Sequence, residues 1–81
     1  MIYVDNARIM WRGKRRYHMT ADSLDELHQF AHQIGVARCW FHAASRHPHY
    51  DITGVQRVAA LDAGAEAVGP RELVTVAKRL H

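Results

Sequence analysis

The fold is decided by residues 16–41, which read RYHMTADSLDELHQFAHQIGVARCWF. Arg16–Ala21 alternates and contains residues that favour strands, so it predicts a strand that ends at Asp22. A helix follows, and the apolar run Val36–Phe41 predicts a buried strand after it. A strand, a helix and a second strand in this order are typical of a βαβ unit with parallel strands.

The helix between these strands has a recognisable beginning, apolar face and end. Ser23 and Glu26 have the spacing of a capping box, which satisfies backbone N–H groups of the first helical turn. Gly35 stands where a left-handed residue commonly ends a helix. The apolar residues that share one helical face are Leu24, Leu27, Ala31 and Ile34.

Toward the C-terminus the pattern predicts a loop and a second helix. His42–Ile52 is predicted to be a loop that Pro48 stiffens. Thr53 and Gln56 have the spacing of a second capping box, and they open a helix that stops at Gly64. The expected inner face of this helix consists of Val55, Val58, Ala59 and Leu61.

The two ends of the chain complete the predicted order of elements. Ala65–Val68 predicts a short strand, and Pro70 has the favoured first position of a third helix. At the N-terminus, Ile2–Val4 predicts a strand, antiparallel or at an edge, and Asn6–Lys14 predicts a loop that turns at Gly13. We therefore expect a single compact α/β domain over residues 1–81, with a mostly parallel sheet of about four strands and three helices in the order β-β-α-β-α-β-α.

Composition limits the class of protein. The 81 residues are 48% hydrophobic and 23% charged, which is typical of a globular domain and not of a disordered segment. One cysteine cannot form an internal disulfide or a cysteine-rich zinc site, and the N-terminus lacks the pattern of a signal peptide. No apolar run is long enough to span a membrane. We therefore expect a cytoplasmic protein without a membrane partner.

Polar residues follow the predicted strands, where ligands bind in open α/β sheets. The densest cluster is Arg46, His49, Tyr50 and Asp51, directly before the N-terminus of the second helix. These side chains predict a phosphate or metal site, and Asp5 after the first strand joins it if that strand is parallel. An alternative is purely structural, with Asp51 capping the helix and Tyr50 packed in the core.

Further histidines and acids have two interpretations each. His18 lies inside the second predicted strand, either as a buried neutral imidazole or as a ligand, and Asp22 either supports the helix cap or joins the site. His28 and His32 are one helical turn apart, a spacing that allows zinc but is more typical of a solvated helix face.

A basic segment supports a different class of function. Its residues Arg8, Arg12, Lys14, Arg15 and Arg16 surround Trp11, within a chain whose formal net charge is +3. Such a segment binds nucleic acid through phosphate contacts and base stacking, or it is a solvated loop.

Several short motifs occur together in one order: Tyr3-Val4-Asp5, Trp11-Arg12-Gly13, His18–Asp22, Glu26-Leu27-His28, Trp40-Phe41 and Arg46–Asp51. The chain resembles a family of small bacterial and phage proteins known only as a domain of unknown function. The resemblance names no reaction, but it implies site residues at Asp5, His18, Asp22, His49, Tyr50 and Asp51. His42 and His47 depart from that family's pattern, which implies that neither is an indispensable ligand.

We therefore expect a polar site at the sheet edge that binds a phosphate-bearing small molecule or a nucleic acid. If the chain is an enzyme, metal-assisted phosphoester hydrolysis or transfer suits these residues, with Asp5, His49 and Asp51 as catalytic residues and as ligands of a divalent ion. The expected ligand-binding residues are Arg46, Tyr50, His18 and Asp22. The alternative is a non-catalytic module that binds nucleic acid or protein through the segment Arg8–Arg16.

Overall fold

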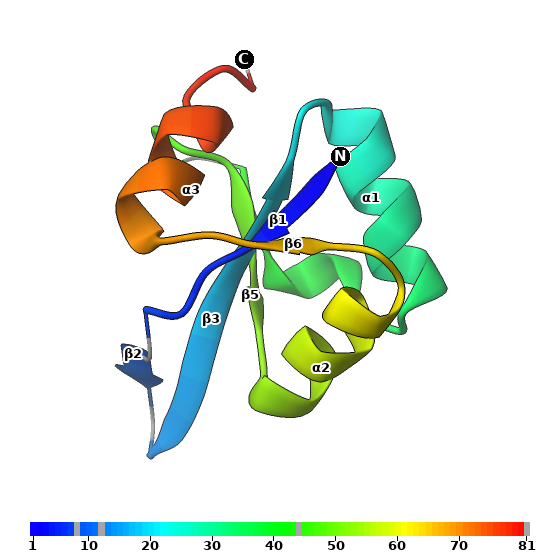
Figure 1. Ribbon diagram of the computed structural model, residues 1–81, viewed down its shortest axis with the longest axis vertical. Helices are drawn as coiled ribbons and strands as arrows, with labels where there is room; N and C mark the ends of the chain where they lie inside the picture. The colour runs from blue at the N-terminus through cyan, green and yellow to red at the C-terminus, as the bar shows by residue number, and fades with distance from the viewer. Residues whose placement is uncertain (8, 12, 44, 81) are drawn as a thin grey trace.

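The computed structural model describes residues 1–7, 9–11, 13–43 and 45–80 (Figure 1). In this part of the chain, strands, three α-helices and one 3-10 turn alternate. Their bounds in chain order are β1 Ile2–Val4, β2 Ile9–Trp11, β3 Lys14–Ala21, α1 Leu24–Gln33, η1 Arg38–Trp40, β4 Phe41–His42, β5 His49–Ile52, α2 Gly54–Asp62, β6 Glu66–Ala67 and α3 Pro70–Ala77.

The sheet is mixed and mainly antiparallel. Its strand order is β4-β5-β3-β1-β6, and β2 pairs with the first residues of β3. Among the described pairs, only β1 and β6 run parallel. The expected mostly parallel sheet of about four strands is therefore wrong, although the α/β class and the three helices are present.

The physical reason is a strand that inserts into the predicted βαβ unit. β4 runs in the same direction as β3, as a strand–helix–strand unit requires, but β5 turns back and lies between them. β5 comes from the stretch His42–Ile52 that we predicted to be a loop. Its alternation was present in the sequence, since Tyr50 and Ile52 are buried on one side of the strand.

The predicted buried strand at Val36–Phe41 is also wrong for most of its length. Its residues form the turn η1 and begin the two-residue strand β4. Val36 is buried, whereas Arg38 and Cys39 are exposed. The aromatic pair at the end of this run packs at the margin of the core, and this packing does not require an extended backbone.

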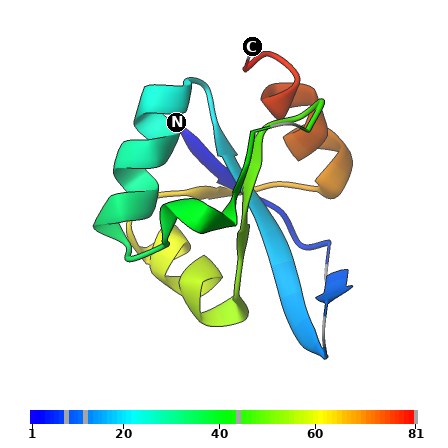
Figure 2. The ribbon, with the colours of Figure 1, turned by 180° about the vertical axis from the view of Figure 1, so that it is seen from behind.

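The predicted loop at Asn6–Lys14 contains β2. Gly13 is the turn residue that we expected, with a φ of +76°, and it connects β2 to β3 as a hairpin. This hairpin extends past the rest of the molecule at one end (Figures 1 and 2).

The helices cover both faces of the sheet. Figures 1 and 2 show α1 and α2 on one side and α3 on the other. Because side chains alternate along a strand, Val4, Met19 and Tyr50 share the face toward α1, where the apolar core lies. The neighbouring residues of β3 and β5, among them His18 and Asp51, therefore face the other way.

The helix ends largely follow the sequence. Thr53 and Gln56 form the expected capping box, and the Ser23 hydroxyl accepts from the Glu26 N–H at 3.2 Å. The inner face expected for α2 is wrong at Val55 and Val58, which are 82% and 57% exposed, whereas Leu61 packs against the core as expected and Ala60 is fully buried. None of the described helices is long and apolar enough to cross a membrane.

Candidate metal centre

The site begins at the end of β1, where Asp5 continues the pairing with β3. Val4 pairs with Met19, and the Asp5 N–H donates to the backbone oxygen of His18 at 3.1 Å. Because side chains alternate along a strand, Asp5 lies on the same face as His18, where it is fully buried.

Asp5 fixes the orientation of the His18 ring. Its Oδ2 accepts from His18 Nδ1 at 2.7 Å, and its Oδ1 accepts from the His18 backbone N–H at 2.9 Å. Arg57 holds the other side of Asp5 by donating from Nε to its backbone oxygen at 2.8 Å. Because Nδ1 donates to a carboxylate, the atom that His18 presents toward β5 is Nε2.

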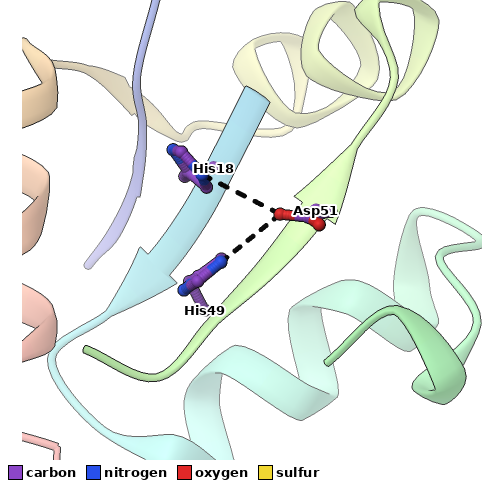
Figure 3. A group of neighbouring side chains, drawn as sticks. All are labelled: His18, His49 and Asp51. Atoms are coloured by element: carbon purple, nitrogen blue, oxygen red, sulfur yellow. Dashed lines mark ion pairs between the residues drawn. The ribbon is translucent and has the colours of Figure 1, made fainter. Parts of the chain in front are cut away.

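His49 is held in the same way. Its Nδ1 donates to the backbone oxygen of His47 at 2.7 Å, because a carbonyl can only accept. Its Nε2 lies 3.3 Å from Oδ1 of Asp51, and Nε2 of His18 lies 3.9 Å from the same oxygen. Figure 3 shows the three side chains converging between β3 and β5.

His42 lies on the outer side of this cluster. Its Nε2 is 2.8 Å from Oδ2 of Asp51, and its ring stacks on that of His49 with a centroid distance of 5.1 Å. The His42 side chain is 48% exposed. We did not predict a role for His42 from the sequence, and its signal would have been the pairing of β4 with β5, which places it opposite His49.

The ionisation of Asp5 and His18 is coupled. Burial opposes ionisation of Asp5, but the hydrogen bonds from the ring and the backbone of His18 outweigh it and lower the pKa of Asp5. The hydrogen bond to Asp5, which outweighs burial, raises the pKa of His18. Burial lowers the pKa of His49, so this imidazole favours the neutral form that binds metals.

The cluster has the dimensions of a metal site. One atom each of His18, His49 and Asp51 lie within 4.8 Å of one another. Ligand atoms of a tetrahedral Zn²⁺ at about 2.1 Å stand roughly 3.4 Å apart, close to the separation of His49 and Asp51. Because Nδ1 of His49 donates to a carbonyl, the lone pair of its neutral ring at Nε2 points toward a carboxylate oxygen, an arrangement that suits a cation between them.

The structure brings Asp5, His18, His49 and Asp51 together but leaves other predicted residues elsewhere. Tyr50 faces the opposite side of β5, where its hydroxyl contacts Nδ1 of His28 at 2.8 Å. Its side chain therefore points away from the cluster.

Two more predicted residues lie outside the cluster. Asp22 follows β3, where its carboxylate accepts from the Tyr3 hydroxyl at 3.2 Å and lines a cavity of about 300 Å³. Arg46 is exposed in the loop before β5. Thr53 caps α2, so Asp51 is not the capping residue.

The basic segment is described in part. Lys14 and Arg15 are exposed at the start of β3, and Arg16 is buried there. Arg8 and Arg12 lie outside the described residues.

Comparisons with known proteins agree with the resemblance that we found in the sequence motifs. A family described as a protein of unknown function (DUF4031) matches residues 2–80. No curated protein and no solved structure matches the chain. Because the match extends over nearly all 81 residues, the chain belongs to the DUF4031 family.

Proposed function

We propose that His18, His49 and Asp51 bind a divalent transition metal ion, and that the chain is a metal-dependent hydrolase of phosphate-bearing substrates. One observation carries the proposal. Both imidazoles donate from Nδ1 to fixed acceptors, and both present Nε2 to the same oxygen of Asp51. Metal-binding histidines commonly have this arrangement, in which the second nitrogen is held by a carboxylate or a carbonyl.

The ligand types favour Zn²⁺ over Mg²⁺ or Ca²⁺. Imidazole nitrogen suits zinc, copper, iron and nickel better than the hard cations that prefer oxygen. Structural zinc sites have four protein ligands, whereas three ligands leave a coordination position for water or substrate. Two histidines and one carboxylate therefore support a catalytic site.

The residues around the ligands have distinct proposed roles. A bound ion would lower the pKa of a coordinated water and polarise a phosphoryl oxygen. Asp5 would hold His18 in the required tautomer. His42, whose Nε2 lies beside Asp51, would accept the proton that a coordinated water loses and pass it to solvent, because its ring is half exposed.

Metal binding is tested with the purified chain and Zn²⁺ by isothermal titration calorimetry. Wild type is expected to bind one ion per chain. Asp51→Asn and His49→Gln should weaken binding by more than the roughly 10- to 100-fold that a change beyond the ligands causes. His32→Gln removes an exposed histidine of α1 and should bind like wild type. Equal binding by all four proteins would contradict the proposed site.

Catalysis is tested separately. The zinc-loaded protein is expected to hydrolyse p-nitrophenyl phosphate or bis(p-nitrophenyl) phosphate, and EDTA should abolish the activity. Tight zinc binding without turnover of either compound would restrict the function to metal binding.

A second candidate function is nucleic-acid binding by the hairpin of β2 and β3. The observation that favours it is the position of Lys14 and Arg15, which are exposed where the hairpin extends past the body (Figure 1). Each phosphate contact with a single strand contributes about 0.7 to the slope of log affinity against log salt. Replacing both residues by glutamine should flatten this slope by about 1–2 for single-stranded DNA or RNA. Affinity that does not change with salt would remove this candidate.

A further inference from the structure

We propose that the cavity between α1, η1 and β5 binds the phosphate group of a small molecule through Arg38, His28 and the hydroxyl of Tyr50. Tyr50 lies on the α1 side of the sheet, whereas the neighbouring residues of β5, His49 and Asp51, face the other way. The cavity is therefore a second site, separate from the candidate metal centre and independent of metal binding.

The cavity has the size and the lining of a site for a small anion. Its volume is about 140 Å³, which equals that of roughly four or five water molecules in the liquid. No carboxylate occurs among the described residues that line it, whereas several cationic or hydrogen-bonding side chains do. These lining residues are His28, His32, Val36, Arg38 and Tyr50. The segment η1 lies beside α1 (Figure 2) and contacts it, so both elements supply lining residues.

His28 and Tyr50 hold each other in place. Nδ1 of His28 lies 2.8 Å from the Tyr50 hydroxyl, and the His28 ring meets the Phe41 ring edge to face with a centroid distance of 4.5 Å. In the neutral imidazole, the Tyr50 hydroxyl donates to Nδ1 and leaves the N–H at Nε2 for a ligand. In the imidazolium, Nδ1 donates to the Tyr50 oxygen and frees the hydroxyl proton as well. Protonation of His28 thus adds a hydrogen-bond donor to the pair.

Arg38 brings a positive charge to the same pair. The carbon at the centre of its guanidinium lies 5.6 Å from the centroid of the Phe41 ring, which His28 also contacts. Burial is the main cause of the lowered pKa of His28, and the charge of Arg38 lowers it further. Among the residues that the structure describes, no carboxylate forms an ion pair with Arg38. Its guanidinium therefore has donors for an anion.

Charge favours phosphate over a carboxylate. The charged groups that act on His28 are Arg38 of η1 and Asp25 of α1, and Asp25 has the smaller effect. An anion in the cavity adds a negative charge beside the imidazole, so it should raise the pKa of His28. A phosphate group carries about −1.5 to −2 near pH 7 and compensates both Arg38 and a protonated His28. A carboxylate compensates only one of them.

Phosphate binding is measured by isothermal titration calorimetry with the full chain in EDTA, which keeps metal ions out of the measurement. Wild type is expected to bind one inorganic phosphate per chain in the millimolar range or tighter. Arg38→Gln should bind about 10- to 100-fold more weakly, as expected for the loss of a charge-assisted hydrogen bond. Arg71→Gln is the matched control, because it removes the same charge from the exposed surface of α3 on the other side of the sheet. It should change the affinity by less than about 3-fold.

Nuclear magnetic resonance locates the bound anion. The imidazole resonances of His28 report its pKa, and sulfate serves as the probe because it stays a dianion over the range in which histidine titrates. Sulfate should raise the pKa of His28 in wild type and have little effect on it in Arg38→Gln. A pKa of His28 that does not change with sulfate in wild type would overturn the proposed site.

The remaining outcomes decide between this site and other modes of binding. Absence of saturable phosphate binding to wild type, or an equal loss in Arg38→Gln and Arg71→Gln, would overturn the inference. If Arg38→Gln folds poorly by circular dichroism, Tyr50→Phe provides the second test, since it keeps the buried ring and removes only the hydroxyl. It should weaken phosphate binding, and unchanged affinity would overturn the role of Tyr50. Arg38→Gln should bind Zn²⁺ like wild type, so failure of this site is distinguishable from failure of the metal centre.

Discussion

Asp5 shows how one buried carboxylate controls the orientation of an imidazole ring, that of His18, on the neighbouring strand. It accepts hydrogen bonds from both the ring and the backbone of His18, so the imidazole has one orientation and one tautomer. The backbone N–H of Asp5 donates to the backbone oxygen of His18, which places Asp5 directly opposite His18. We predicted Asp5 as a metal ligand from the sequence, and we propose that it orients the ligand His18, because both of its carboxylate oxygens accept hydrogen bonds from that residue.

The pKa shifts of this pair predict how its contribution to stability depends on pH in EDTA. His18 has a raised pKa, so its stabilisation is complete below about pH 6.5 and is lost as pH rises through the raised value. Asp5 has a lowered pKa, so its contribution is present above about pH 3.9 and is lost as pH falls through the lowered value. Both contributions are therefore present from about pH 4 to 6.5.

The measurement compares the free energy of unfolding of wild type and Asp5→Asn across pH. We expect Asp5→Asn to be less stable by about 1.5–3 kcal/mol near pH 5.5, the range for hydrogen bonds to charged groups. The difference should shrink toward pH 8. His49 titrates in both proteins, so its effect largely cancels. A difference that grows with pH would show that the pair does not stabilise the fold in this way.

At the scale of elements, the helix ends and turns that depend on neighbouring residues were predicted correctly from the sequence. The pairing between strands was not. The Thr53–Gln56 capping box, the turn at Gly13 and Pro70 at the start of α3 depend on neighbouring residues and are all present. The insertion of β5 depends on a contact with β3 that local alternation does not specify. The alternation of His49-Tyr50-Asp51-Ile52 is compatible with a strand, but the sequence does not show which strand it pairs with.

The same reason explains what could be predicted of the candidate site. His49 and Asp51 are close in the sequence, so the sequence alone predicted that they belong to one cluster. His18 lies in β3 and Asp5 directly follows β1, so their contact depends on the pairing of these two strands. His42 reaches Asp51 only because β4 lies beside β5.

The cap of α2 gives a prediction for this element. Thr53 accepts from the Gln56 N–H at 3.1 Å, and Gln56 accepts from the Thr53 N–H at 2.9 Å. Thr53→Ala should lower the free energy of unfolding by about 1 kcal/mol, measured by urea denaturation. Val55→Ala is the control, since Val55 is 82% exposed and should change stability by less than about 0.5 kcal/mol. A larger loss in the Val55 variant would contradict the described face of α2.

At the scale of the whole molecule, the two faces of the sheet have different chemistry. The face toward α1 and α2 carries the apolar core, and the opposite face carries the histidines and carboxylates beside α3 (Figures 1 and 3). A domain of this size has a thin core and modest stability. A ligand that joins β3 to β5 therefore has a large effect on the whole fold.

Zinc should accordingly raise the melting temperature. At a free Zn²⁺ concentration of one hundred times the dissociation constant, binding adds about 2.7 kcal/mol, which for a chain of this length corresponds to roughly 10–20 °C. Differential scanning fluorimetry with Zn²⁺ and with EDTA measures the shift. His49→Gln should lose most of it and His32→Gln should keep it. An equal shift in both variants would indicate binding elsewhere on the chain.

The shortness of the two outer strands has a consequence for self-association. β4 and β6, which end the sheet on either side, contain two residues each, Phe41–His42 and Glu66–Ala67. An outer strand of this length offers few backbone groups to a second chain, so it is a poor template for extending the sheet between molecules. The charge of Glu66 adds repulsion between identical β6 edges. Edge-to-edge polymerisation through β4 or β6 is therefore disfavoured when the protein is concentrated.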